Sequence, residues 1–159
     1  MATEQGFLHS PLGWLRVECV DGALVSIDYL ADPPSAASSR SGPCAALALA
    51  WLEAYFSRRP LPGLPPLAPE GTRFQQLVWR ALADIPRGQT RTYGELARQL
   101  GTAPRAVGGA LRSNPIPLFI PCHRIVAAHG LGGYDGAGEE GLRRKEWLLA
   151  HEREPVERT

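Results

Sequence analysis

Cysteine is scarce in this chain. Its 159 residues include three cysteines, Cys19, Cys44 and Cys122, which is an odd number and includes no CxxC pair. Such a set argues against a disulfide framework and favours free thiols in a reducing compartment. Cys19, Cys44 and His9 are the one combination that approaches a zinc site, but nothing in their spacing argues for one. We therefore expect neither a metal nor a cofactor.

Long apolar runs are also missing. Hydrophobic residues make up 44% of the chain, enough for a core, yet no stretch approaches the roughly 20 apolar residues of a membrane-spanning helix. The first residues, MATEQGFLHSPLG, lack the basic start and apolar stretch of a signal peptide. We expect a cytoplasmic protein that binds no membrane.

Net charge is small, +1, but it is unevenly distributed. Between residues 86 and 124 six arginines stand against one acid, Glu95, which gives this segment +5. The arginines are at positions 87, 91, 98, 105, 112 and 124. A basic block in a near-neutral chain predicts a face that binds a polyanion. An equally simple interpretation is a solvated arginine surface.

The N-terminal part combines strand and helix signals. Residues 13–30 alternate apolar and polar side chains around Asp21-Gly22, which predicts a β-hairpin. Pro43 then opens a predicted helix, because proline is tolerated at the first helical position.

A proline-rich segment divides the chain. Residues 60–71 hold five prolines and indicate a stiff linker. We therefore expect two domains, an N-terminal α/β domain of residues 1–67 and a C-terminal domain of residues 68–159.

Two capping boxes mark helix starts in the C-terminal part. Thr72 with Gln75 opens one helix, and Thr92 with Glu95 opens a second that Gly101 ends. A third helix begins almost at once, so the pair is typical of a helix-turn-helix.

The third predicted helix has an unusual polar face. Arg105, Gly108, Gly109 and Arg112 share it at helical spacing. Each interior glycine costs about 1 kcal/mol relative to alanine, so two in a row call for a compensating close approach. We expect that approach to be the minor groove of DNA, with Arg105 free to insert into the duplex. The alternative is packing against another helix of the same protein.

The segment IPCHRIV, residues 120–126, carries the candidate nucleophile. Three prolines, at 115, 117 and 121, stiffen the path from the third helix to Cys122. A free thiol, with a pKa of about 8.5, is mostly protonated at neutral pH, and a neighbouring base makes it nucleophilic. The thiol is thus predicted to be positioned relative to DNA.

These motifs together resemble the O6-alkylguanine-DNA alkyltransferases. The resemblance rests on PCHR, on RAVGGALRSNP before it, on KEWLLAHE after it, and on GTRFQQLVWRALADIPRGQTRTYGELA. It is weaker at SPLGWL and covers most of the chain. It implies an α+β fold, with a ribonuclease-H-like N-terminal domain, a small antiparallel sheet with a helix, and a mostly helical, winged-helix-like C-terminal domain that accepts the alkyl group.

The resemblance implies a single-turnover reaction. Cys122 takes the alkyl group from O6-alkylguanine and keeps it; O4-alkylthymine remains an open substrate. His123 helps deprotonate the thiol through a water molecule, and Glu152 orients His123. Tyr93 donates toward the departing guanine, and Asn114 braces the turn that holds Cys122.

The resemblance also implies how the lesion is reached. The partner is double-stranded DNA containing the lesion, the protein is a monomer, and Arg105 replaces the base that is flipped out. The DNA-binding residues are Arg105, Ala106, Gly108, Gly109, Arg112 and Thr92. The substrate pocket is formed by Tyr134, Ile125 and Asp135, and Arg124 looks structural.

One segment departs from the family pattern. Residues 135–141, DGAGEEG, are longer than expected, and we expect a loop there, over the pocket mouth. The rival functions are a non-catalytic lesion sensor, which Cys122 argues against, and a thiol hydrolase, which would turn over. A winged-helix regulator would need major-groove contacts that glycines cannot make.

Overall fold

The computed structural model describes residues 2–35, 40–134 and 138–156. The chain forms two compact units, Met1–Glu70 with Pro155–Thr159, and Gly71–Glu154. Within the described residues no helix is both long and apolar enough to cross a membrane.

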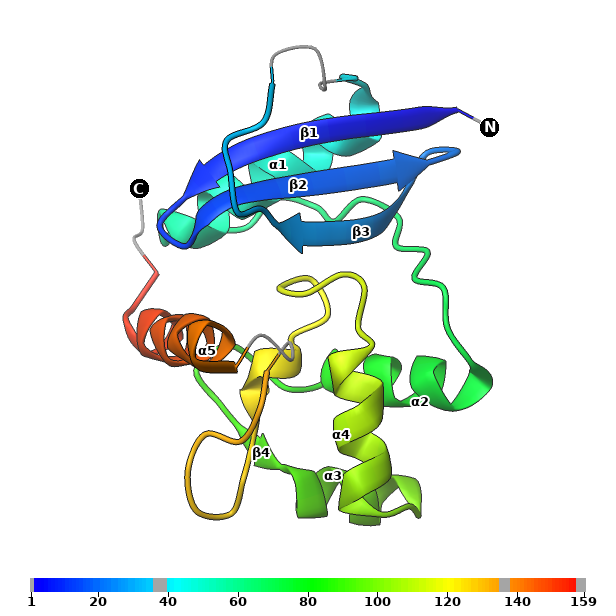
Figure 1. Cartoon of the computed structure of the whole chain (residues 1–159), viewed down its shortest axis with the longest axis vertical. Helices are drawn as coiled ribbons and strands as arrows, with labels where there is room; N and C mark the ends of the chain where they lie inside the picture. Colours follow the sequence, from blue (N-terminus) through cyan, green and yellow to red (C-terminus); the bar gives the residue numbers. More distant parts are fainter. Residues whose placement is uncertain (1, 36–39, 135–137, 157–159) are drawn as a thin grey trace. The chain divides into compact units, whose positions relative to one another are not determined.

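The first unit is a three-stranded antiparallel sheet with one helix (Figure 1). Its strands β1 (Thr3–Ser10), β2 (Gly13–Val20) and β3 (Ala23–Tyr29) pair in sequence order. The predicted hairpin is confirmed as β2 and β3, which are joined at Asp21 and Gly22, both with positive φ. The sequence did not predict β1.

The helix of this unit, α1 (Pro43–Phe56), packs against all three strands. It begins at Pro43, as predicted, and its N-cap Gly42 has no side chain to cap the first turn. The Glu4 carboxylate of β1 accepts a hydrogen bond from Ala45 N at 3.1 Å instead. A strand side chain therefore fixes the start of the helix.

The second unit is mostly helical. Its helices are α2 (Arg73–Leu82), α3 (Tyr93–Leu100), α4 (Pro104–Arg112) and α5 (Gly138–Arg153). Both predicted capping boxes are present, at the starts of α2 and α3. Gly101 ends α3 with φ 67°, as predicted, and three residues lead to α4. Trp79 Nε1 of α2 donates to Ala110 O of α4 at 2.8 Å and anchors that helix.

A short parallel pair of strands joins distant parts of this unit. Strand β4 (Arg91–Thr92) precedes α3, and β5 (Ile125–Val126) follows the short 3-10 helix η2 (Cys122–Arg124). Arg91 pairs with Ile125 and Thr92 with Val126. Because Tyr93 follows β4 and Cys122 precedes β5, this pairing brings the start of α3 close to the candidate nucleophile.

The expectation of a loop from Asp135 to Gly141 is wrong in its second half. Gly138–Gly141 form the first turn of α5. Glu139 and Glu140 favour that helix start because they lie in its first turn, where the helix dipole stabilises negative charge. Glu140 also pairs with Arg144 at 3.0 Å, one turn later. Asp135 lies outside the described residues.

The content of the chain is thus mixed α and β, with a small antiparallel three-stranded sheet and several helices, as expected.

Candidate active site

The candidate nucleophile lies on a tightly bonded turn. Cys122 begins η2 and is 5% exposed. Its backbone N donates to Ile120 O at 2.7 Å. Asn114 Nδ2 donates to that same carbonyl at 2.8 Å, and Asn114 Oδ1 accepts from Ile116 N at 2.9 Å. Asn114 therefore ties the end of α4 to the turn that holds the thiol.

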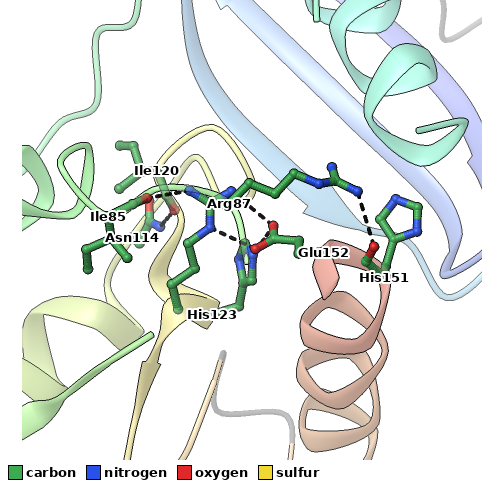
Figure 2. A network of polar contacts seen from close by, with 8 residues as sticks. Ile85, Arg87, Asn114, Ile120, His123, His151 and Glu152 are labelled. Carbon is green, nitrogen blue, oxygen red and sulfur yellow. Dashed lines mark hydrogen bonds and ion pairs between the residues drawn. The ribbon is translucent and has the colours of Figure 1, made fainter. Parts of the chain in front are cut away.

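A buried ionic network adjoins the thiol. His123 Nε2 lies 2.6 Å from Glu152 Oε2 (Figure 2). Arg124 donates from Nε to Glu152 Oε1 at 2.8 Å and from Nη2 to Glu152 Oε2 at 3.1 Å. Its remaining terminal nitrogen, Nη1, donates to Ile85 O at 2.7 Å. The network thus joins η2 to α5 and to the segment that follows α2.

The charges in this network decide which nitrogen of His123 carries the proton. Burial of Glu152 alone would raise its pKa, but hydrogen bonds from His123 and Arg124 outweigh burial and hold the pKa well below its usual range. Burial lowers the pKa of His123, so its ring is neutral at pH 7. A carboxylate only accepts, so Nε2 carries the hydrogen and Nδ1 keeps its lone pair.

The other ring nitrogen of His123 is therefore a base. Nδ1 is buried and has no hydrogen-bond partner among the described residues. A buried acceptor without a partner is rare, and a water molecule can satisfy it. Nδ1 is therefore the atom of the His123 ring that can accept a proton.

Lys145 is a buried charged residue at the site that the sequence reasoning missed. It is 0% exposed, and its Nζ donates to Ile125 O and Gly133 O, both at 2.6 Å. The ammonium lies 5.8 Å from the centre of the Tyr93 ring. Burial lowers the pKa of Lys145 to about 8, and the charge of the Cys122 thiolate opposes that change.

The amino-acid composition could have drawn attention to Lys145. Lys145 is the one lysine among 17 basic side chains, and all the others are arginines. A compact ammonium that fits a closed site is not interchangeable with a guanidinium.

Tyr93 lies at the start of α3 and faces the same region. Its hydroxyl donates to Gly133 O at 3.3 Å. Burial raises the pKa of Tyr93, and the negative charge of Cys122 raises it further. The phenol therefore stays protonated and is a donor at neutral pH. Tyr93 and Lys145 both experience the charge of Cys122, so these three residues form one electrostatic group.

A hollow of about 270 Å³ opens beside Tyr93. Gly108 and Arg112 of α4 line one side of it, and Gly133 and Tyr134 line another. Of the predicted pocket residues, Tyr134 therefore lines the hollow. Ile125 is fully buried in β5, and its carbonyl accepts a hydrogen bond from Lys145.

The predicted DNA-binding face of α4 is open. Arg105, Ala106 and Arg112 are exposed. A Cβ atom built at Gly109 meets no described heavy atom within 4 Å, and at Gly108 the nearest, on Tyr93, is 3.9 Å away. Packing against a neighbouring helix therefore does not account for these glycines in the described part of the chain.

Two other predictions have structural counterparts. The hydroxyl of Thr92 caps α3 by accepting from Glu95 N at 3.1 Å, so any contact of Thr92 with DNA is additional to that role. Cys19 and Cys44 are buried free thiols that share a hydrogen bond, and His9 stacks on Trp14. The described residues contain no group of three or more side chains suited to a metal ion.

Comparisons with known proteins point in one direction. The family model of the 6-O-methylguanine DNA methyltransferase DNA-binding domain matches residues 73–154. The human methylated-DNA–protein-cysteine methyltransferase is 39% identical over 165 residues, which cover 91% of this chain and 78% of the human protein. The protein of that name from Mycolicibacterium paratuberculosis is 41% identical over 150 residues, with coverage of 91% and 88%.

Solved structures agree over nearly the whole chain. The O6-methylguanine methyltransferase of Mycobacterium tuberculosis matches with a TM-score of 0.81 at 35% identity, and the match covers 98% of this chain and 97% of the other. A crystal structure of Mycobacterium tuberculosis OGT in complex with DNA matches with a TM-score of 0.78 at 36% identity, covering 92% and 91%.

Proposed function

Because this chain belongs to the family of methylated-DNA–protein-cysteine methyltransferases, we propose that it repairs DNA by direct reversal. It transfers the alkyl group of O6-alkylguanine to Cys122 in one irreversible event. The observation that carries this proposal is the arrangement around the thiol, where a histidine base oriented by a buried carboxylate follows the nucleophile directly.

The reaction is a displacement at a saturated carbon. His123 Nδ1 takes the thiol proton through one water molecule, and the sulfur of Cys122 attacks the alkyl carbon. The new sulfur–carbon bond forms as the bond to O6 breaks, and the electron pair of that bond goes to guanine. Tyr93 donates a hydrogen bond to the departing base and stabilises its developing charge. Glu152 keeps its negative charge and holds the proton of His123 on Nε2.

The alkylated base reaches the thiol by leaving the duplex. Helix α4 enters the minor groove, where Gly108 and Gly109 permit close approach and Arg105 fills the space of the flipped base. The base then occupies the hollow beside Tyr93 and Tyr134. The full set of DNA contacts proposed is Arg105, Ala106, Gly108, Gly109, Arg112 and Thr92.

Finer assignments belong to the same proposal. Helices α3 and α4 form a helix-turn-helix within a winged-helix-like domain of residues 68–159, and residues 1–67 form a ribonuclease-H-like support domain. The protein acts as a monomer in the cytoplasm, on double-stranded DNA. The short connection between α3 and α4 supports the first assignment, and the division into two compact units supports the second.

Intact mass spectrometry tests the proposal. After mixing with DNA that contains O6-methylguanine, each chain should gain one methyl group, which peptide mapping places on Cys122, and Cys122→Ser should gain none. A sensor would bind the DNA without any change in mass, and a thiol hydrolase would release alkyl products repeatedly. Either outcome, or a methyl group on Cys19 or Cys44, would overturn the assignment.

A further inference from the structure

All three nitrogens of the Arg124 guanidinium form hydrogen bonds, and two of them bind the carboxylate that orients His123. Two of its nitrogens bind both oxygens of Glu152, at 2.8 and 3.1 Å, and the third binds Ile85 O at 2.7 Å. Its side chain is 13% exposed and that of Glu152 is 1% exposed. A residue that only filled space in η2 would need no such fork.

We infer that Arg124 is a positioning residue of the alkyl transfer, because it fixes Glu152 as an anion and thereby keeps Nδ1 of His123 free to act as the base. This inference rests on the proposed function and deepens it. The sequence had suggested only a structural role for this arginine.

The first part of the argument is geometric. The fork sets the plane of the Glu152 carboxylate, since both oxygens are bound at once. Oxygen Oε2 then faces Nε2 of His123 at 2.6 Å, and the ring cannot turn without losing that bond. The turn that carries Cys122 holds Arg124 as well, so nucleophile, base and carboxylate keep a fixed relation.

The second part is electrostatic. Burial raises the pKa of a carboxylate, so a buried glutamate beside a histidine and without a further cation would tend to take up the proton itself. The charge of Arg124 works against that outcome and lowers the pKa of Glu152. It also opposes protonation of the imidazole, as does Lys145, whereas Glu152 favours protonation. Among the described residues, Arg124, Lys145 and Glu152 are the charged groups that act on the His123 ring, besides the Cys122 thiol that precedes it.

Loss of the Arg124 charge should shift the pH dependence of the transfer rate in a defined direction. If the charge of Arg124 is removed, the pKa values of Glu152 and His123 both move upward, and the rise at His123 puts a proton on Nδ1 at a higher pH than in the wild type. The acid limb of the reaction should therefore move to higher pH. A purely structural arginine would instead give the same fractional loss at every pH.

The experiment measures transfer from free O6-benzylguanine, which avoids DNA binding, between pH 5 and pH 9. For Arg124→Gln we expect the rate ratio between pH 8 and pH 6 to rise severalfold over the wild type, about sixfold being the most that moving one pKa by one unit can produce between these pH values. Arg124→Lys keeps the charge but loses the fork, so its rate should fall while its pH profile stays. The control is Arg87→Gln, since Arg87 bonds His151 O at 3.1 Å in the same region (Figure 2) and should leave the profile unshifted.

Thermal unfolding reports whether each variant is folded. If Arg124→Gln does not fold, Arg124→Lys decides, because a profile that shifts although the charge is kept would overturn the inference. An equal loss for Arg124→Gln at all pH values would overturn it too. The ¹⁵N chemical shifts of the His123 ring, assigned with His123→Asn, give a readout independent of transfer and should show a bare Nδ1 in the wild type that protonates at higher pH in Arg124→Gln. A wild-type protein that takes neither benzyl from the free base nor methyl from O6-methylguanine DNA would refute the proposed function, whereas an unchanged histidine signal would refute only the role of Arg124.

Discussion

Lys145→Met removes a buried cation and leaves the side chain nearly the same length. Burial disfavours this cation, since the fall of the pKa from 10.5 to about 8 corresponds to about 3 kcal/mol. Against that stand two hydrogen bonds to the carbonyls of Ile125 and Gly133, each contributing about 1.5–3 kcal/mol because the donor is charged. The two bonds together contribute about 3–6 kcal/mol against about 3 kcal/mol for burial, so the variant should lose at most about 3 kcal/mol of unfolding free energy and remain folded.

For the reactivity of Cys122, in contrast to the stability, no opposing contribution offsets the loss of the Lys145 charge. The Cys122 thiolate favours the charged form of Lys145, and by reciprocity the ammonium favours the thiolate. Without the ammonium, a smaller fraction of Cys122 is ionised at neutral pH. We expect Lys145→Met to transfer benzyl from O6-benzylguanine up to about tenfold more slowly at pH 7, as for a shift of about one pKa unit, and to recover as the pH is raised toward 9.

Rates measured against pH provide the test, together with urea unfolding of the same samples. Arg143→Met is the matched control, because it removes a cation from the same helix, α5, at a side chain that is 77% exposed. The control should keep the wild-type rate and profile. A Lys145→Met profile parallel to that of the wild type would mean that the ammonium only holds the two carbonyls and does not act on the thiolate.

Three further predictions concern DNA binding and acid stability. Gly109→Ala should raise the unfolding free energy by up to about 1 kcal/mol, because alanine favours the helix. The same variant should bind duplex DNA more weakly in a titration, and unchanged binding would contradict a close approach of the DNA at this position. Arg105→Ala should slow transfer from an alkylated duplex far more than transfer from free O6-benzylguanine, and equal losses would argue against base flipping by Arg105. Because the folded pKa of His123 lies below its unfolded value, urea unfolding should show stability falling as the pH drops below about 6.5. The lowered pKa of Glu152 adds a further loss below about pH 4.3 that Glu152→Gln should lack. A stability that stays flat between about pH 7 and pH 4.5 would contradict the sign for His123, and one that stays flat between about pH 4.5 and pH 3 would contradict the sign for Glu152.

Local signals predicted the local structure. The capping boxes at Thr72 and Thr92, the helix end at Gly101 and the turn at Asp21-Gly22 each depend on neighbours within a few residues, so the sequence displays them directly. Pairings between distant segments left weaker traces. Strand β1 does not stand out in the sequence and is stabilised by pairing along its length with β2. Strands β4 and β5 have two residues each, too few for any periodic pattern.

The expectation at residues 138–141 failed for a related reason. Glycines at 136, 138 and 141 favoured a loop. The helix nevertheless begins at Gly138, where the two following acids meet the positive end of the helix dipole and arginines one turn later. Contacts made by the rest of α5, whose Leu148, Leu149 and Glu152 are buried, outweigh the preference of the glycines.

The basic segment shows how charge in a sequence can serve two purposes. Its six arginines suggested one face for a polyanion, but Arg87 and Arg124 are turned inward, on the carbonyl of His151 and the carboxylate of Glu152. Arg105 and Arg112 are the members that α4 exposes. The positive charge near the thiol therefore comes from side chains that no DNA phosphate needs to neutralise, and it acts whether or not DNA is bound. The nucleophile and its base can be in their working protonation states before the lesion arrives, so we expect a free alkylated guanine to react at the same thiol without the duplex.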